Sequence, residues 1–599
     1  MIWKTEHINP SAKSSPLKVQ QLIHRNLELT STPSPSFSIG IVGGGPKGMY
    51  ALEELIRQMK DEKLNNNLRV YWWNETINFG SGPNYQIDQA DFLLINYCIG
   101  HVDAWDKTND IEENQLNLME WIEKNKIIDK KVQPTDFASR ALLGYYLQNT
   151  LLEIISSKPN HLEIILIPEK VENVHIISHN HLKVETIDHE FQVNNLLLAT
   201  GHCYQNTPLI QSKNDEFSNK YFNSAYPVTK LNSISTQSKV GIIGWGLTFI
   251  DVALALTEGR GGTFDKEGNY ISSGEEPTLL PFSRNQLPIM PRGPIYGDTT
   301  YQLHFINEHW VRSLQAISKD RKIDFSEDIL PTLERELKFA FYSTLLQTRD
   351  EIKVESYIQT LAEEEVFSYK KLLFPNIPKA SNVQNSYINY LAELITEAEK
   401  GELKSPLMAA AAVWREASPL ISKLYASGGF TGQSQNHLDK KLFGAFCRTS
   451  YGPPIENMKK ILALLKAGII KTYWKDEIEL NYDEIEKHFI LKNSKHQEEV
   501  DFIIDARIAR PKIQQNNQAF YQNLLENQII KPFDNEGYQP GNIDMDLKGK
   551  IIHPQNIPLY LYGTNTEGVL LDNDSLSRKK NNLAPLWVDE IIHQLKSLK

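Results

Sequence analysis

A glycine-rich turn between an expected strand and an expected helix constrains the fold of this chain more than any other feature. Gly43, Gly45 and Gly48 follow a short β-branched run and precede residues 49–59, whose apolar side chains recur at helical spacing. In a dinucleotide-binding βα unit, the first glycine permits the tight turn and the second lets a pyrophosphate approach the backbone. The third glycine lets the helix lie close to the strand. The turn therefore predicts a Rossmann-like unit with these three glycines at the cofactor phosphates.

A second glycine pair occupies the same position in a later strand–helix unit. Gly244 and Gly246 follow an apolar run, but Phe249 stands where the third glycine would be. The pair predicts another phosphate-binding turn, with a simple tight turn as the alternative. Ser283 and Arg284 end the next expected strand, where a 2′-phosphate would bind, so the pattern favours NADPH over NADH.

Two further features support a pair of nucleotide-binding units. Glu75 ends the strand after the first turn and is expected to bind a ribose, although Asn74 could fill that position. Between the two units, an apolar strand ends in Ala199, Thr200 and Gly201, as at the crossing point of a two-dinucleotide flavoprotein. We therefore expect an α/β fold with two Rossmann-like dinucleotide-binding domains, FAD on the first and NADPH (or NADH) on the second.

Composition and hydrophobic periodicity divide the 599 residues into five segments. Residues 1–36 are polar and end in a Ser/Pro stretch, which predicts a flexible tail or linker. The FAD-binding domain is expected at 37–201 and 500–599, and the NAD(P)-binding domain at 202–299. Helical periodicity dominates 300–499, which predicts a large helical insert that encloses the substrate. An oligomerisation surface is the alternative for this insert, and the oligomeric state stays open.

Charge and cysteine content exclude several classes of protein. Lys and Arg number 63 against 74 Asp and Glu, a net charge of −11, which argues against a nucleic-acid backbone binder. Cys98, Cys203 and Cys447 are too few and too far apart for a disulfide framework or a zinc site, so no metal is expected. Free thiols, no long apolar run and no secretory signal together predict a cytoplasmic protein without a membrane anchor.

The sequence resembles the FAD/NAD(P)-binding flavoproteins related to the flavin-dependent N-hydroxylating monooxygenases, and within them the aspartate N-monooxygenase-like group. The segments that carry the resemblance include IGIVGGGPKGM (39–49), GIIGWGLTFIDVALALTEGRGGTF (241–264), SRNQLP (283–288), YGPPIEN (451–457) and NDSLSRKKNNLAPLW (573–587). The resemblance implies an FAD-dependent, NAD(P)H-using monooxygenase that uses O2 to oxygenate a small amine or amino acid through a flavin C4a-peroxide. An FAD-binding sensor or scaffold without turnover, and a flavin reductase or oxidase, are the alternatives.

The resemblance also implies further site residues. Additional FAD contacts are expected at Gly80, Gly82, Asn96, Gly563, Thr564 and Asn565, and Arg140 is expected to contact an FAD phosphate or a substrate carboxylate.

An amine must be unprotonated to act as a nucleophile, so a base or a desolvated pocket is required. His101 and Asp103 are the catalytic candidates, although a lone histidine is more often structural. Arg292, Arg448 and Tyr451 are candidates for binding a substrate carboxylate, with ordinary interface contacts as the alternative.

Overall fold

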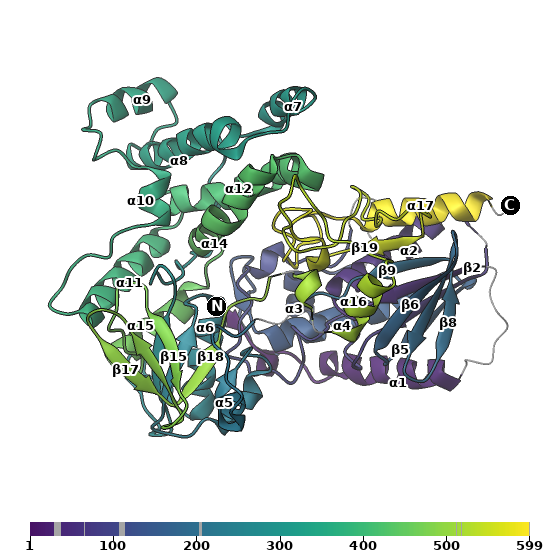
Figure 1. Ribbon diagram of the computed structural model, residues 1–599, viewed down its shortest axis with the longest axis horizontal. Helices are drawn as coiled ribbons and strands as arrows, with labels where there is room; N and C mark the ends of the chain where they lie inside the picture. The colour runs from purple at the N-terminus through teal and green to yellow at the C-terminus, as the bar shows by residue number, and fades with distance from the viewer. Residues whose placement is uncertain are drawn as a thin grey trace.

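The computed structural model describes residues 1–28, 37–64, 66–106, 114–202, 207–510, 512–516 and 518–597. It has two parallel β-sheets, and a helical region rises beside one of them (Figure 1). We call the described residues of 1–202 and 512–597 the first unit, those of 207–299 and 470–510 the second unit, and residues 300–469 the helical unit.

The first unit is built on five parallel strands in the order β19-β9-β2-β3-β5. The strands are β2 (Phe37–Val42), β3 (Leu68–Trp73), β5 (Leu162–Ile167), β9 (Asn195–Leu198) and β19 (Leu559–Leu561). They are almost continuously apolar because helices cover both faces of the sheet. These helices are α1 (Ser15–Glu28), α2 (Pro46–Asp61), α4 (Arg140–Ser156) and α17 (Ala584–Ser597), and α1 and α17 lie on opposite sides of the sheet (Figure 1).

The remaining elements of the first unit lie outside this sheet. They are β1 (Ile2–Trp3), β4 (Phe137–Ala138), α3 (Leu118–Asn125), α16 (Ala519–Glu526) and an antiparallel sheet of β6 (Val171–Ser178), β7 (His181–Thr186) and β8 (Glu190–Val193).

The second unit repeats the parallel arrangement with four strands in the order β10-β18-β11-β14. Its elements are α5 (Asp215–Lys220), β10 (Tyr221–Phe222), β11 (Lys239–Ile243), α6 (Leu247–Ala255), β12 (Thr263–Phe264), β13 (Tyr270–Ile271), β14 (Thr278–Phe282), β15 (Glu479–Asp483), β16 (His488–Lys492), β17 (Gln497–Val500) and β18 (Phe502–Asp505). Because β18 pairs with both β10 and β11, the expected domain boundary at residue 500 is wrong. The sequence of an apolar strand does not indicate which sheet the strand joins, so β18 could not be assigned to the second sheet from sequence alone.

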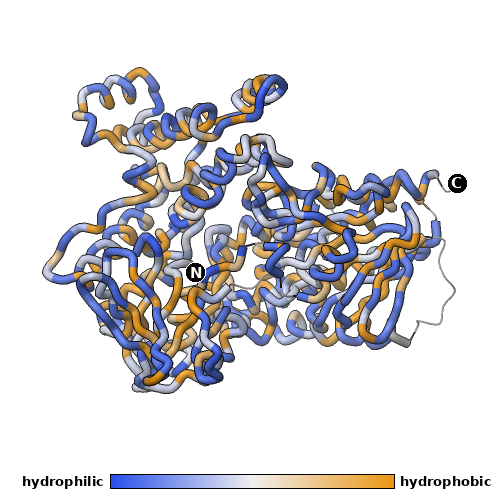
Figure 2. Tube along the Cα trace, viewed as in Figure 1, coloured by the Kyte–Doolittle hydropathy of each residue, from blue (hydrophilic) through white to orange (hydrophobic). Residues whose placement is uncertain are grey.

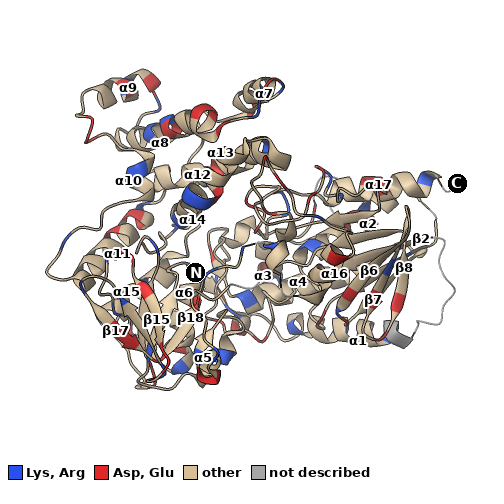
Figure 3. Cartoon of the chain, in the orientation of Figure 1, with Lys and Arg blue, Asp and Glu red and all other residues tan. Residues whose placement is uncertain are grey.

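The described elements between residues 308 and 466 are helical. They are α7 (Glu308–Ile317), α8 (Leu330–Leu345), α9 (Glu351–Gln359), α10 (Tyr369–Leu373), α11 (Val383–Lys400), α12 (Pro406–Tyr425), α13 (Gly432–His437), α14 (Phe443–Ser450) and α15 (Ile455–Lys466), with π-helical turns before α8 and α14. Helices α7–α9 project from the molecule, with mixed hydropathy (Figure 2) and both signs of charge (Figure 3). In the described chain no helix is both long enough and apolar enough to cross a bilayer.

The second unit and the helical unit share one hydrophobic core, whereas the first unit has its own. Trp245, directly after β11, stacks on Tyr387 of α11 with ring centroids 4.8 Å apart. The two units therefore pack as a single body against the first unit.

The N-terminal segment corrects the expectation of a flexible tail at 1–36. β1 pairs with β4, and Trp3 is fully buried and donates its indole N–H to Asp136 at 2.9 Å. Val19 and Ile23 of α1 are buried in the core of the first unit. The few apolar residues of this polar segment are spaced so that they face the core. The average composition of the segment does not show this spacing. Residues 29–36 lie outside the described part of the chain.

Candidate functional site

The first glycine turn has two glycines that serve packing and one that faces open space. Gly43 has φ +113°, and a Cβ there would lie 2.2 Å from the carbonyl oxygen of Ala199. A Cβ on Gly48 would lie 2.6 Å from the carbonyl oxygen of Gly43. Gly45, in contrast, would meet nothing within 4 Å, and it caps α2 without a side-chain hydrogen bond. The uncapped helix terminus next to this open space fits a dinucleotide pyrophosphate.

Some of the residues predicted to lie near the first turn contact it, and one is exposed. The loop of Gly80 and Gly82 lies on the first turn, since a Cβ on Gly82 would be 2.9 Å from the Cα of Gly45. Asn74, the alternative to Glu75, accepts a hydrogen bond from the N–H of Gly44 at 3.0 Å and so holds the turn itself. Glu75 follows β3 and is exposed. Its role at a ribose stays a prediction.

The ends of β9 and β19 meet beside the same turn. Asn565 donates from its side-chain amide to the carbonyl of Leu198 at 2.8 Å, which fixes the loop of Gly563 and Thr564 next to Thr200 and Gly201. Gly201 has φ +65° and open space where a Cβ would be, so this edge of the sheet leaves room for a ligand.

Lys47 is a site residue that the sequence reading missed, although it lies within the first glycine motif. It follows the first residue of α2, and a Cβ on Gly563 would lie 3.1 Å from its Cγ. Its ammonium donates to the carbonyl of Ser577 at 3.0 Å and lies 5.1 Å from the ring centroid of Tyr562. Burial, then the charges of Arg578 and Lys580, lower the pKa of Lys47 to about 7. A nearby cofactor phosphate would favour its charged form.

The second glycine turn repeats this geometry. Gly244 has φ +104°, Gly246 would meet nothing within 4 Å, and α6 begins directly afterwards without a side-chain cap. Phe249 is fully buried and packs edge-to-face on Trp245, so the residue in place of the third glycine joins the core. The open space over this turn fits a second dinucleotide.

The residues after β14 form one edge of this second site. Ser283 and Arg284 line the same cavity as Gly244 and Gly246. Arg284 is exposed and makes no ion pair within the described residues, so its charge is available to a ligand.

A cavity of about 3360 Å³ lies among the three units. The second glycine turn, Asn96 of the first unit, and Arg415 and Tyr451 of the helical unit all line it. Pro83, next to the loop on the first turn, lines it as well. The cavity therefore extends from the second dinucleotide turn to the loop that lies on the first turn.

Arg140 has a partner that the sequence did not suggest. Its guanidinium pairs with Asp251 of α6 at 2.6 Å and donates to the hydroxyl of Tyr226 at 3.2 Å. Asp251 is 3% exposed, and Tyr226 also donates to it. Arg140 thus forms an ion pair between the first and second units; because it also lines the cavity, its contact with a cofactor phosphate or substrate carboxylate stays a prediction.

The two catalytic candidates both line the cavity. His101 has its Nε2 3.2 Å from the carbonyl oxygen of Ile295, and its ring lies between those of Tyr97 and Tyr296. Desolvation is the largest effect on the pKa of His101 and lowers it below the ordinary value. Asp103 accepts a hydrogen bond from the backbone N–H of Trp105 at 3.1 Å.

The three substrate-binding candidates differ in how many hydrogen bonds their side chains already make to other protein atoms. Arg448 donates to the carbonyls of Pro288, Leu372 and Leu373 at 3.1–3.3 Å, which makes it a tie between segments. The Tyr451 hydroxyl donates to Asp572. Arg292 makes a single side-chain hydrogen bond to the described residues, to the carbonyl of Asn96.

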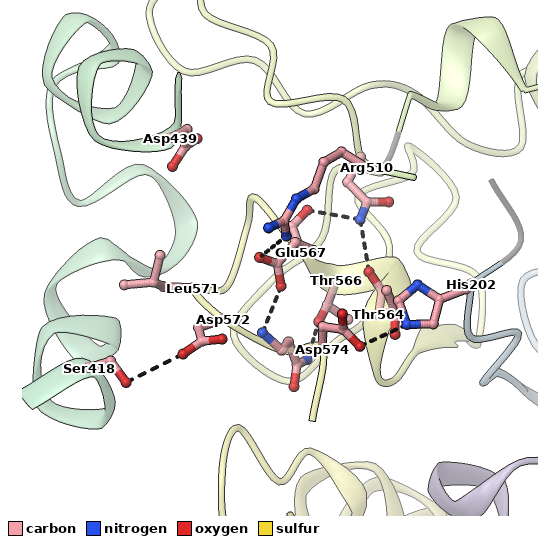
Figure 4. A network of polar contacts seen from close by, with 12 residues as sticks. His202, Ser418, Asp439, Arg510, Thr564, Thr566, Glu567, Leu571, Asp572 and Asp574 are labelled. Carbon is pink, nitrogen blue, oxygen red and sulfur yellow. Dashed lines mark hydrogen bonds and ion pairs between the residues drawn. The ribbon is translucent and has the colours of Figure 1, made fainter. Parts of the chain in front are cut away.

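A polar network that no sequence motif indicated joins the three units (Figure 4). His202 pairs with Asp574 at 2.7 Å, and Arg510 pairs with Glu567 at 3.7 Å. His202 and Arg510 lie on the two segments that cross between the first and second units. Burial is the main cause that raises the pKa of Glu567 to about 7. Ser418 of α12 extends the network to the helical unit by donating to Asp572 at 3.4 Å.

Comparison with known proteins agrees with this geometry. A family model described as FAD-NAD(P)-binding matches residues 40–203. A nitrosuccinic acid synthase from Aspergillus oryzae is 24% identical over 591 residues, covering 90% of each chain. A nitrosuccinate-forming L-aspartate N-monooxygenase from Streptomyces davaonensis is 22% identical over 495 residues, covering 72% of this chain and 76% of that protein. The crystal structure of L-lysine 6-monooxygenase from Pseudomonas syringae aligns with a TM-score of 0.45 and 11% identity, covering 93% of this chain and 99% of that one.

The fold and the sequence comparisons lead to the same assignment. Each parallel sheet ends in a glycine turn with open space at a helix N-terminus, and the first turn lies within the FAD-NAD(P)-binding match. The two curated relatives extend the similarity over most of the chain. The chain therefore carries an FAD-NAD(P)-binding region at residues 40–203, and over most of its length it is similar to flavin-dependent N-monooxygenases.

Proposed function

We propose that this chain is an FAD-dependent, NAD(P)H-using monooxygenase that oxygenates the amine nitrogen of a small amino acid. The observation that carries the proposal is the cavity that is lined by the second dinucleotide turn and reaches Pro83, beside the loop that lies on the first turn. The names of the two curated relatives give aspartate oxidation or nitrosuccinate formation as the activity of those proteins, which supports an amino acid as the substrate class.

The protein's part in such a reaction is to hold and orient the reactants. Bound FAD would supply the redox chemistry by taking a hydride from the nicotinamide and activating O2 for transfer to a nucleophile. The α2 N-terminus at Gly45 would hold the FAD pyrophosphate, and the α6 N-terminus at Gly246 would hold that of NAD(P)H. The exposed Arg284 beside Ser283 supports NADPH as the preferred donor.

The cavity wall would also set the protonation state of the amine. An amine nitrogen that is to be oxygenated must lose its proton first. His101 has a lowered pKa and so stays largely neutral at neutral pH, which fits a proton acceptor. Enclosure by the helical unit supports its role as the part of the chain that limits water access to the substrate.

Anaerobic reduction followed by O2 tests this function in one experiment. FAD-loaded protein is mixed with NADPH or NADH while the flavin absorption is followed, and then O2 and L-aspartate are added. We expect fast bleaching by NADPH, slower bleaching by NADH, and an N-oxygenated amino acid by mass spectrometry that carries label from isotopic O2. Absence of bleaching would point to a sensor or scaffold. Bleaching that yields only hydrogen peroxide with every amino acid tried would point to an oxidase.

A further inference from the structure

A buried guanidinium lies in the cavity wall. Arg292 is 6% exposed, and its backbone N–H donates to the carbonyl of Pro453 at 2.9 Å, so the residue is firmly anchored. One Nη donates to the carbonyl of Asn96, and the guanidinium lies 5.1 Å from the ring centroid of Tyr97. Its Nε is buried without a hydrogen-bond partner. Part of the guanidinium's hydrogen-bonding capacity is therefore unused.

The charge of Arg292 is also unbalanced. Within the described residues, no carboxylate oxygen lies within ion-pair distance of it. The nearby carboxylates are used by Arg415, which pairs with Glu402 at 2.8 Å and Glu416 at 2.9 Å. Arginine stays protonated in proteins, and a buried charge without a counter-charge costs several kcal/mol. This position therefore favours an anionic ligand.

Most of the other arginines that line the cavity have carboxylate partners. Arg140 pairs with Asp251, Arg415 pairs with two glutamates, and Arg448 donates to three backbone carbonyls. Arg507 and Arg510 also pair with carboxylates, and Arg284 is exposed. Among the described residues Arg448, like Arg292, has no carboxylate partner and an unpartnered buried Nε, but both of its Nη atoms already donate to carbonyls. The Arg292 side chain comes from the body formed by the second and helical units, yet it contacts the first unit through Asn96. A ligand bound there would lie at the boundary between the two bodies.

We propose that Arg292 binds the carboxylate of the amino-acid substrate and thereby selects amines that carry a carboxylate. This assignment deepens the proposed function and rests on it. A guanidinium offers a planar fork that matches a carboxylate in two parallel hydrogen bonds. His101 lines the same cavity. Its Nε2 contacts the carbonyl of Ile295, which is three residues after Arg292 in the sequence. A carboxylate held by Arg292 would therefore keep the substrate near a neutral imidazole.

The test uses FAD-loaded protein and succinate, a dicarboxylate without an amine to oxygenate. Arg292→Met and Arg292→Lys are compared with wild type, and Arg260→Met is the matched control. Arg260 donates to the backbone carbonyls of Leu231, Ile234 and Glu275, and it does not line the cavity. Succinate binding is measured by calorimetry, and KM is measured for L-aspartate and for NADPH.

We expect Arg292→Met to weaken succinate binding and to raise the KM for aspartate by about 10- to 100-fold, as for loss of a charged hydrogen-bonded pair. Arg292→Lys recovers part of the loss because the charge remains. Flavin reduction by NADPH stays within about twofold of wild type, since Arg292 belongs neither to a glycine turn nor to the Ser283–Arg284 edge of the second site. Arg260→Met behaves as wild type in all three measurements.

Two outcomes would overturn the assignment. Unchanged succinate binding in Arg292→Met would make the residue a structural contact. A raised KM for NADPH with normal succinate binding would mean that the anion is a coenzyme phosphate. The succinate measurement does not require turnover, so it stays informative if no amine is oxygenated. FAD content and circular dichroism of Arg292→Lys and Arg292→Met show whether each variant is folded.

Discussion

Single residues decide whether the first turn binds a cofactor or supports the fold. Gly45 has extended backbone angles that alanine also adopts, and a methyl group there meets no protein atom within 4 Å. Gly45→Ala should therefore leave the thermal stability of FAD-free protein nearly unchanged but weaken FAD binding by about tenfold or more, because the methyl group occupies the pyrophosphate's approach. Fluorescence titration with FAD measures the affinity, and thermal unfolding measures the stability.

Gly43→Ala is the contrasting variant for this prediction. Its positive φ and the 2.2 Å approach to Ala199 make any side chain incompatible with the turn, so it should destabilise the protein with or without FAD. If Gly45→Ala bound FAD as tightly as wild type, the phosphates would have to lie elsewhere.

The residue scale also shows how far sequence reasoning reaches into the site. Glycine motifs can be recognised in the sequence because the backbone conformation of the turn requires glycines at fixed spacing. The partner of Arg140 cannot be predicted from local sequence, because Asp251 is 111 positions away and only the packing of two domains brings them together. Lys47 could have been found from its place inside the first motif. Glu567 carries no such signal, since its charged partner Arg510 comes from another segment.

At the scale of elements, helix α4 of the first unit meets helix α6 of the second unit through one buried ion pair. Arg140 is the first residue of α4, and Asp251 lies in α6 after the second glycine turn. Because α6 also starts at the expected NAD(P)H site, this pair sets the orientation of the coenzyme-binding helix relative to the first unit. We infer that the Arg140–Asp251 pair is a positioning contact between the two dinucleotide sites.

A double-mutant cycle tests this contact. Arg140→Gln alone leaves Asp251 buried without a counter-charge and should lower the free energy of unfolding by about 3–5 kcal/mol. Adding Asp251→Asn should restore part of that loss, with a coupling energy of about 1–3 kcal/mol by denaturant unfolding. Flavin reduction should become slower with NADPH but not with dithionite, which needs no coenzyme orientation.

The exposed pair Arg335–Glu355 is the matched control for the cycle, because its side chains are 51% and 49% exposed and its coupling should be below about 1 kcal/mol. Additive losses at Arg140 and Asp251, or equal slowing with both reductants, would contradict a positioning role.

Elements also show why the fold class was predictable while its boundaries were not. Strand–glycine–helix order predicts two parallel dinucleotide folds, and both sheets confirm it. β18 returns to the second sheet more than two hundred residues after β14, and α1 packs on β5 across a long connection. Such long-range pairings depend on tertiary packing rather than on local pattern.

On the scale of the whole molecule, two bodies with separate hydrophobic cores meet across a polar boundary. One core belongs to the first unit, another runs through the second and helical units, and a smaller one lies within the second unit. The contacts described between the two bodies are largely polar, as at Arg140–Asp251, Arg292–Asn96 and Tyr451–Asp572. Domains with separate cores and a polar interface tend to unfold separately, and a ligand stabilises the part that binds it.

We therefore expect two calorimetric transitions for FAD-free protein, with FAD raising the transition of the first unit. FAD at about 100 times its Kd adds about 2.7 kcal/mol to the stability of the unit that binds it, which shifts that transition by roughly 2–4 °C for a unit of this size. Hydrogen exchange assigns the shifted transition through peptides of β2 and β9, and Gly45→Ala should abolish the shift. A single transition that moves as a whole would instead mean that the polar boundary couples both bodies as strongly as a shared core.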